Sequence, residues 1–212
     1  MSERHPIIAI TGSSGAGTST VTSTFSNIFR REGVKAAMVE GDSFHRYERL
    51  EMKKRQAEAE RDGNKHFSHF GPDNNLFGEL ETLFRRYSEC GQGRVRQYLH
   101  NAAEAAPFQQ APGTFTAWED LPPDTDMLFY EGLHGAVRTP EHDVARYPDL
   151  LIGVVPVINL EWIQKLWRDK KQRGYSTEAV TDSTLATVKV VVNVPGAVTA
   201  NVPLVVSPLT ST

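Results

Sequence analysis

The sequence has few of the features that would tie it to a membrane, a nucleic acid or an oxidising compartment. Its one cysteine, Cys90, excludes a disulfide within the chain and is typical of a reducing compartment. The net charge of −3 at pH 7 gives no indication of a nucleic acid as the main partner. The longest apolar run, around "LLIGVVPVI", is too short to span a bilayer and contains Pro156. The charged start "MSERHPII" has no apolar signal core. We therefore expect a soluble cytoplasmic protein with no membrane or nucleic-acid partner.

The remaining composition predicts one α/β domain. The chain of 212 residues is 39% hydrophobic and 23% charged, which suits a single globular core. "HPIIAITG" is an apolar run that ends in glycine, and "TSTVTSTFSNIFRREG" then carries apolar residues at helical spacing. "KAAMVEGD" follows as a second apolar run. Strand, glycine-rich loop, helix and strand in this order indicate a βαβ unit with a mostly parallel sheet.

The loop of this unit, "GSSGAGTST", lacks one residue of a common phosphate-binding pattern. In G-x-x-x-x-G-K-[ST], backbone amides hold phosphates, lysine reaches the outer phosphates and the hydroxyl binds Mg²⁺. Gly12 and Gly17 have the correct spacing and Ser19 stands at the metal position, but Thr18 replaces the lysine. The loop still leaves a strand and opens a helix, as phosphate binding requires. The residues predicted to bind ATP are Gly12, Ser13, Ser14, Gly15, Ala16, Gly17, Thr18, Ser19 and Thr20.

Two carboxylates are expected where strands end. "MLFYEG" ends in Glu131, which could reach Mg²⁺ together with Ser19. Asp42 closes the second strand in "EGDSFHR", and the carboxyl ends of parallel strands face the ligand crevice. A carboxylate there can accept the proton of a hydroxyl that attacks the γ-phosphorus of ATP. A helix N-cap is the competing interpretation of Asp42.

Basic residues follow both of these regions. His45, Arg46, Arg49 and Lys53 form a cationic run after Asp42 that would suit a phosphorylated second substrate. In "KLWRDKKQRG", Lys165 and Asp169 lie four residues apart on one helix face, with Arg168 and Arg173 nearby. Such a helix could close as a lid and supply the charge that the loop lacks. An exposed charged helix is the alternative interpretation.

The rest of the chain has a coarser pattern. Helices are expected over 49–63, 76–91 and 159–176, and a strand over 93–100. Residues 106–126 are rich in turn formers and are expected to be mobile or to lie on the surface. The runs "MLFYEGLHG" and "DLLIGVVPVIN" resemble buried parallel strands.

Together, the loop, "EGDSFHR", "FYEGLHG", "VVPVINLEWIQK" and "RDKKQRGYSTEAVTD" resemble the bacterial-type phosphoribulokinases, which are related to uridine kinases. The resemblance covers residues 1 to about 182 and implies a P-loop NTPase-like three-layer fold. It implies ATP-dependent phosphorylation of ribulose 5-phosphate at its 1-hydroxyl in the Calvin cycle, with Mg²⁺. Threonine in the lysine place belongs to this bacterial pattern. The implied roles are Asp42 as base, Lys165 and Asp169 as further catalytic groups, Glu131, Ser19 and Asp169 near Mg²⁺, Arg168 on the nucleotide side, and His45, Arg49, Tyr98, His100 and Arg173 on the sugar phosphate.

The resemblance also implies assembly and regulation. Members of this bacterial group are typically large homo-oligomers that NADH activates, and Arg31 matches a position associated with that activation.

The final segment departs from the family. Residues 183–212 contain one charged side chain, Lys189, and three prolines, so their fold is uncertain. We expect residues 1–182 to form the kinase core, and we hypothesise that a truncation or frameshift replaced the family's C-terminal part.

Other functions are weighed against this one. A uridine-kinase-like enzyme would share the loop but accept nucleosides. A truncated remnant could bind nucleotide without activity. A GTPase switch usually carries N-K-x-D, whereas the only "NK" here, Asn64–Lys65, is followed by "HF". A dinucleotide-binding dehydrogenase is disfavoured because the glycines run in the wrong order, G-x-x-G-x-G.

Overall fold

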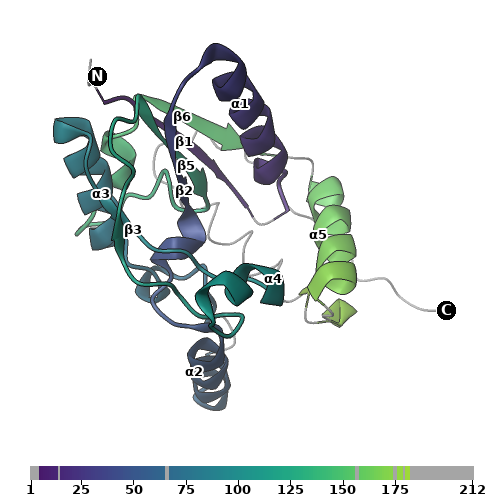
Figure 1. Cartoon of the computed structure of the whole chain (residues 1–212). Helices are drawn as coiled ribbons and strands as arrows, with labels where there is room; N and C mark the ends of the chain where they lie inside the picture. Colours follow the sequence, from purple (N-terminus) through teal and green to yellow (C-terminus); the bar gives the residue numbers. More distant parts are fainter. Residues whose placement is uncertain are drawn as a thin grey trace.

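The computed structural model describes residues 5–13, 15–64, 67–155, 158–173, 176–178 and 180–181. These described residues form six strands, and helices follow most of them along the chain (Figure 1). The strands are β1 (Ile7–Gly12), β2 (Ala36–Glu40), β3 (Arg94–Val95), β4 (Glu119–Asp120), β5 (Met127–Gly132) and β6 (Leu150–Val154). The α-helices are α1 (Thr18–Glu32), α2 (Arg49–Arg61), α3 (Phe77–Cys90), α4 (Ala102–Ala105) and α5 (Ile158–Arg173), and the short 3₁₀ helices are η1 (Gly41–Phe44), η2 (Pro72–Asn74), η3 (Ala106–Phe108) and η4 (Val144–Arg146).

The main sheet is parallel and has the strand order β2-β5-β1-β6. Parallel pairing brings the carboxyl ends of β1, β2 and β5 to one edge, where a ligand crevice is expected. The register places Glu40 of β2 beside Glu131 of β5, and Ile10 of β1 on the other side of Glu131. The end of β5, with Glu131, therefore lies between the end of β1, which leads into the phosphate loop, and the end of β2, which leads to Asp42.

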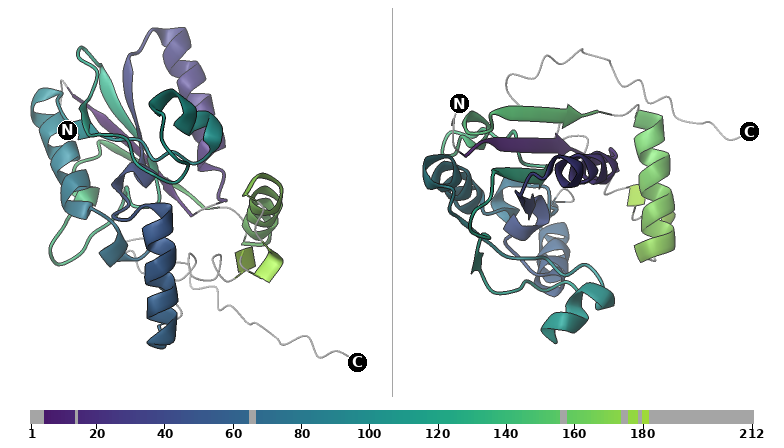
Figure 2. Two further views of the ribbon diagram at one scale, coloured as in Figure 1. Left: turned by 60° about the horizontal axis from the view of Figure 1, so that its bottom comes forward. Right: turned by 45° about the horizontal axis from the view of Figure 1, so that its top comes forward.

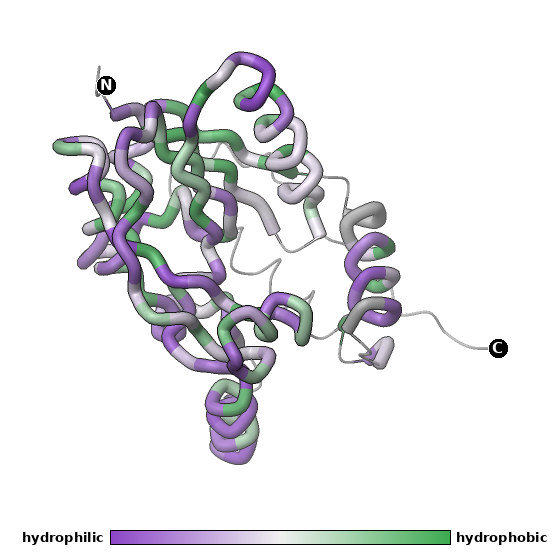
Figure 3. The backbone as a smooth tube through the Cα atoms, in the orientation of Figure 1, coloured by the Kyte–Doolittle hydropathy of each residue, from purple (hydrophilic) through white to green (hydrophobic). Residues whose placement is uncertain are grey.

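Helices α1 and α3 cover opposite faces of this sheet, which makes three layers (Figures 1 and 2). Alternate strand residues divide between the two faces because successive side chains of a strand point in opposite directions. Phe129 of β5 packs with Phe25 and Phe29 of α1. Tyr130 packs on Phe84 of α3. The apolar strands form the centre, whereas α2 projects from the body and is hydrophilic along its length (Figure 3).

Most expected elements are present. Helix α1 ends where the sequence placed its glycine: Gly33 adopts φ 71°, and its N–H bonds to the carbonyl of Phe29. The expected strand over 93–100 is shorter, because only Arg94–Val95 pair with the two-residue β4. Residues 106–126 lie largely on the surface, but Phe115 and Leu121 are buried.

The prediction that both later apolar runs are buried is wrong for β6. Leu150 and Leu151 are 47% and 40% exposed, because β6 forms the edge of the sheet and, among the described residues, pairs only with β1. Within the described ranges, no helix combines the length and apolar character needed to cross a membrane. The segment 183–212, with its predicted separate character, lies outside the described residues.

Candidate active site

The loop between β1 and α1 has the geometry of an anion-binding turn. Gly15 and Gly17 have φ values of 100° and 94°, a region that side-chain-bearing residues rarely adopt. Gly17 is the N-cap of α1, and no described side chain caps this helix or places a negative charge in its first turn. The first N–H groups of α1 and the positive end of its dipole therefore face the loop. Ser13 and Ala16 are buried, Ser19 and Thr20 are exposed, and Ser14 lies outside the described residues.

Thr18, at the lysine position, is buried and turned inward toward β5. Its side chain hydrogen-bonds to the Glu131 carboxylate. Burial raises the pKa of Glu131 and the nearby Asp42 charge raises it further, while the Thr18 bond opposes both. Gly12 makes this approach possible, since a Cβ there would lie 2.9 Å from Thr18 Cγ2 and 2.8 Å from the Val154 carbonyl oxygen. Thr18 thus links the loop to the strand-end acid.

A close backbone approach joins the ends of β2 and β5. A Cβ on Gly41 would lie 2.5 Å from the Tyr130 hydroxyl oxygen and 2.9 Å from Gly132 Cα. Tyr130 is fully buried, and burial raises its pKa. The glycine at position 41 lets the chain turn over Tyr130 into η1, which carries Asp42. Asp42 and Glu131 thereby both lie at the carboxyl ends of the strands, where the ligand crevice of such a sheet is expected, and we call this region the strand-end crevice. Asp42 is not a helix cap with a side-chain hydrogen bond.

Two histidines flank the Asp42 carboxylate. His45 Nε2 lies 3.2 Å from Asp42 Oδ1, and His100 Nε2 lies 3.6 Å from Oδ2. Although burial opposes its ionisation, the charges of His45 and His100 and the hydrogen bond from His45 hold the pKa of Asp42 well below its usual range. The side chain remains 47% exposed, so a substrate hydroxyl can reach it.

The other predicted substrate residues surround this pair. The Tyr98 ring is edge-on to both His45 and His100, with centroid distances of 6.1 and 4.9 Å. Arg49 donates to the His100 carbonyl oxygen at 2.8 Å, and its guanidinium lies 5.8 Å from the Tyr98 ring centre. His45 and Arg49 were predicted as part of a cationic run, and Tyr98 and His100 through the family resemblance alone. The structure brings all four together with Asp42.

Helix α5 stands beyond the carboxyl ends of β1 and β6 (Figure 2). Lys165 is buried, and its ammonium lies 5.4 Å from the centre of the Phe70 ring. Asp169 is also buried, and its Oδ1 accepts from Arg168 Nε at 2.9 Å. The shared face expected for Lys165 and Asp169 is therefore the covered face of α5. The side chain of Arg173 lies outside the described residues.

Several residues at this site were not selected from the sequence. Asn75 accepts a hydrogen bond from His45, and Arg96 donates to the His45 carbonyl oxygen at 2.6 Å. The His69 ring packs against His45 at a tilt of 42°, with centroids 4.9 Å apart. His134 is buried and bonds to the Phe70 carbonyl oxygen at 3.3 Å. Burial lowers the pKa of His69 and of His134 to about 4. The only sequence signal for them was two histidines in "HFSHF" and one in "EGLHG", and neither pattern indicates a partner.

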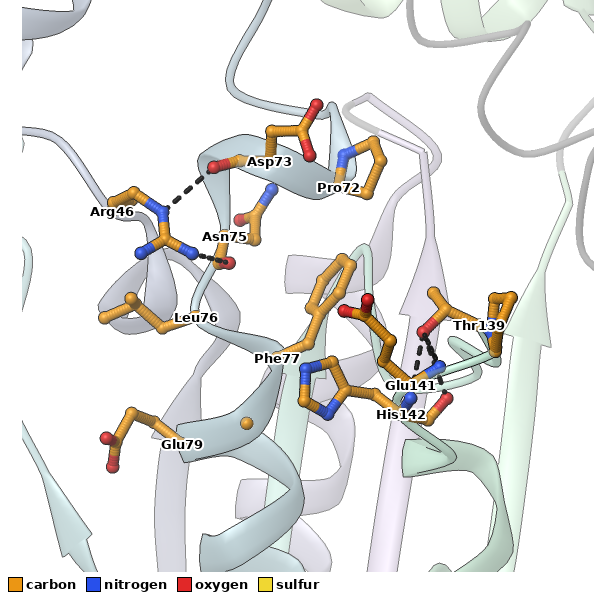
Figure 4. Close-up of a pocket in the computed structure, with 12 residues that line it drawn as sticks. Arg46, Pro72, Asp73, Asn75, Leu76, Phe77, Glu79, Thr139, Glu141 and His142 are labelled. Atoms are coloured by element: carbon orange, nitrogen blue, oxygen red, sulfur yellow. Dashed lines mark hydrogen bonds between the residues drawn. The ribbon is translucent and has the colours of Figure 1, made fainter.

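A hollow of about 590 Å³ beside the start of α3 is a separate feature (Figure 4). Its lining includes the acidic side chains of Asp73, Glu79 and Glu141. Arg46 lies at its rim but donates to the carbonyl oxygens of Asp73 and Asn75. A phosphate would meet mainly like charge there. The strand ends, with the phosphate loop and its uncapped helix, are therefore the better site for a phosphorylated ligand.

The donor set in the crevice fits ATP and Mg²⁺. An uncapped helix N-terminus with left-handed glycines suits phosphates. The exposed Ser19 hydroxyl and the Glu131 carboxylate are hard oxygen donors of the kind that Mg²⁺ prefers. On the described residues, no cluster of three or more acidic, histidine or cysteine side chains forms a ready-made metal site.

Comparison with known proteins gives a consistent relationship. Residues 7–194 match the model of the phosphoribulokinase / uridine kinase family. The chain is 75% identical over 185 residues to the plasmid phosphoribulokinase of Cupriavidus necator, covering 87% of this chain and 63% of that protein. It is 64% identical over 185 residues to the phosphoribulokinase of Nitrobacter vulgaris, covering 87% and 64%. The chain thus spans somewhat less than two thirds of the length of these relatives.

Solved structures share the fold. Phosphoribulokinase from Rhodobacter spheroides has a TM-score of 0.76 and 53% identity over 89% of this chain and 64% of that one. A possible uridine kinase from Bacillus stearothermophilus has a TM-score of 0.53 at 16% identity, over 85% of this chain and 87% of that one. The second likeness concerns the fold alone.

Proposed function

Because the chain belongs to the phosphoribulokinase / uridine kinase family, we propose that it transfers the γ-phosphate of ATP to the 1-hydroxyl of ribulose 5-phosphate. The product is ribulose 1,5-bisphosphate, the substrate of carbon fixation in the Calvin cycle. The relatives named phosphoribulokinase support this choice. One observation carries it: the half-exposed Asp42 carboxylate lies between two histidines, at the same end of the sheet as the phosphate loop.

In the proposed reaction, Asp42 accepts the proton of the sugar hydroxyl as that oxygen attacks the γ-phosphorus. The bond from the γ-phosphorus to the bridging oxygen breaks, and ADP leaves. Phosphoryl transfer depends mainly on positioning and charge neutralisation, so a strong base is not required. The ionised state of Asp42 makes it available as a proton acceptor across the physiological pH range.

The other residues bind and position the two substrates. The loop from Gly12 to Thr20 holds the ATP phosphates through backbone N–H groups, and Ser19, Glu131 and Asp169 supply the oxygen donors for Mg²⁺. Mg²⁺ would neutralise charge on the phosphates. Arg168 serves the nucleotide side. His45, Arg49, Tyr98, His100 and Arg173 hold the sugar phosphate.

Helix α5 supplies the positive charge that Thr18 cannot. In the described structure Lys165 is held at the Phe70 ring, and Asp169 is paired with Arg168. We infer that α5 moves as a lid and brings Lys165 to the transferring phosphate when both substrates are bound. A buried lysine on a helix at the strand ends supports this role.

We also infer activation by NADH through Arg31. This residue and Arg30 line a hollow of about 540 Å³ on the last turns of α1, at the end of that helix remote from the loop. Two neighbouring arginine side chains at such a position suit the phosphates of a dinucleotide. Arg31→Gln should abolish the response to NADH and leave the basal rate unchanged. The family resemblance adds a homo-oligomer to the proposal, and the composition adds a cytoplasmic location.

The deciding experiment is ATP-dependent phosphorylation by the purified chain, with Mg²⁺ and with or without NADH. Ribulose 5-phosphate and uridine are offered separately as acceptors. Turnover with the sugar phosphate alone supports the proposal, and turnover with uridine would replace it by a nucleoside kinase. A folded preparation that binds ATP and phosphorylates neither acceptor would identify a nucleotide-binding remnant.

A further inference from the structure

The buried amide of Asn75 has an orientation that its partners determine. Its Nδ2 donates to the carbonyl oxygens of His69 and Gly71, at 2.7 and 2.8 Å. Both partners can only accept hydrogen bonds. The reverse orientation of the amide would place Oδ1 against two oxygen atoms at these distances. The nitrogen therefore faces the loop, and the oxygen faces His45.

This orientation fixes one proton on the His45 ring. His45 Nδ1 lies 2.9 Å from Asn75 Oδ1, which can only accept, so Nδ1 carries a hydrogen and donates it. The backbone brings the two side chains together. His45 and Asn75 face each other in an antiparallel bridge, and the N–H of Leu76 bonds to the Phe44 carbonyl oxygen at 2.7 Å. Both side chains are buried, so solvent does not compete for the bond.

The opposite side of the ring fixes the second proton. His45 Nε2 lies 3.2 Å from Asp42 Oδ1, and an ionised carboxylate oxygen also only accepts. A hydrogen bond there requires a hydrogen on Nε2. With acceptors at both nitrogens, the consistent form of the ring is the imidazolium cation.

We propose that Asn75 is a positioning residue that fixes His45 as an imidazolium, which in turn keeps Asp42 ionised and oriented toward the acceptor substrate. The role of Asp42 rests on the proposed function, whereas the charge state of His45 does not. Other groups around the ring bear on its charge. They are Asp42 on η1, His69 in the loop, Arg96 after β3, Tyr98 with its ring edge-on, and His134 after β5.

These neighbours shift the pKa of His45 in both directions. Burial and the Arg96 charge lower the pKa of His45, whereas Asp42 and the Asn75 bond raise it, and the net result lies above the usual value. Burial lowers the pKa of His69 to about 4, so this neighbouring ring is neutral and adds no repulsion near pH 7. The cation at His45 is therefore compatible with its whole surroundings.

The test is a pH titration of the full chain with ¹⁵N-labelled histidine, in which NMR reports protonation at each ring nitrogen. His45→Asn identifies the His45 signals among those of the seven histidines. We expect both nitrogens of wild-type His45 to be protonated at pH 7.5, about one unit above the ordinary histidine pKa. A neutral His45 at that pH would overturn the proposal.

Three variants separate the role of Asn75 in protonation from its role in the loop. Asn75→Ala removes the acceptor and should lower the His45 pKa by about one unit, the effect of one hydrogen bond to the charged form. Asn75→Asp keeps an acceptor at the ring but loses both bonds to the loop carbonyl oxygens, so it should leave His45 charged even though the loop is loosened. The matched control is Asn74→Ala: Asn74 is buried and donates to the Ser68 carbonyl oxygen at 2.7 Å, so its loss loosens the same loop without touching the ring.

Equal pKa shifts in Asn75→Ala and Asn74→Ala would reduce Asn75 to a loop residue and contradict the proposal. If Asn75→Ala does not fold, the wild-type titration decides, since a neutral His45 at pH 7.5 overturns the proposal. In the kinase assay, Asn75→Ala should move the alkaline fall of kcat/KM for ribulose 5-phosphate down by about one pH unit, with the KM for ATP unchanged. An inactive wild-type chain would refute the proposed function and leave the NMR result to stand alone.

Discussion

The phosphate loop and the Asp42 crevice lie at one edge of the same sheet, separated by the end of β5, and they are built differently. The loop lies within nine consecutive residues and presents backbone N–H groups at the start of α1. The crevice is formed by side chains from segments far apart in the chain, which include Asp42, Asn75 and His100. We call the phosphate loop the nucleotide half of the site, and the side chains around Asp42, which would receive the acceptor substrate, the acceptor half. The nucleotide half depends on local conformation, and the acceptor half depends on long-range hydrogen bonds. Substitutions can test whether the two halves act independently.

The largest expected effect is that of Asp42→Asn. The amide cannot accept the substrate proton, so turnover should fall by about two to four orders of magnitude, as for loss of a general base. ATP affinity, measured by calorimetry, should stay within a few-fold of wild type because the loop is unchanged. The matched control is Glu40→Gln, which removes an exposed carboxylate at the end of β2, two residues before Asp42. A comparable loss of turnover in the control would assign the effect to charge and not to proton transfer.

Acid should destabilise the chain through the acceptor half. The pKa of buried His134 is about 4, compared with 6.5 for the unfolded chain, so between these values the unfolded state binds more protons. The stability that neutral His134 contributes is complete above pH 6.5 and is lost as the pH falls toward 4, by up to about 3 kcal/mol. His69 acts in the same direction, whereas His45, with its raised pKa, acts in the opposite one.

His134→Gln isolates the contribution of this residue. The free energy of unfolding, measured in urea at pH 7 and pH 5, should depend less on pH in the variant than in wild type. An equal dependence of the unfolding free energy on pH in both proteins would show that His134 is not the cause of the loss of stability in acid. ATP binding at pH 7 should be the same in both proteins.

The nucleotide half can be perturbed alone through Gly12. In Gly12→Ala the new Cβ would lie 2.8 Å from the Val154 carbonyl oxygen and 2.9 Å from Thr18 Cγ2. Overpacking of this kind costs about 1–3 kcal/mol, so ATP affinity should fall by roughly tenfold to hundredfold. Gly153→Ala on β6 is the control, since a Cβ there meets nothing within 4 Å. The His45 signals in NMR should not change in either variant, and a change would show that the halves are coupled.

These differences also explain what could be predicted from the sequence. Gly12 and Gly17, the helix that ends before Gly33 and the acids at strand ends follow from local patterns, because strand and helix periods and glycine spacing are properties of short segments. Asn75 and His134 had no such signal. Each gains its role only when folding brings a distant partner to it, as with Asn75 and His45, thirty residues apart.

The position of β6 shows the same limit in the fold. Its apolar sequence matches a central strand, but Leu150 and Leu151 are exposed because β6 is at the edge. Hydrophobicity reports that a strand belongs to a sheet, and strand order depends on the whole topology. The placement of Lys165 against Phe70 likewise depends on where α5 crosses the strand ends.

The smallest expected effect concerns Thr18, the residue in the lysine place. Thr18→Val keeps the shape of the side chain but removes its hydrogen bond to Glu131. One such bond contributes about 1 kcal/mol, so the Mg²⁺ concentration that gives half-maximal turnover should rise about fivefold. Thr18→Ser keeps the hydroxyl and should behave like wild type. If Thr18→Val has no effect, the Thr18 hydroxyl is dispensable, and residue 18 serves only to pack against Gly12. If valine acts as expected, this loop uses its lysine position to orient the strand-end acid, and the positive charge comes from α5.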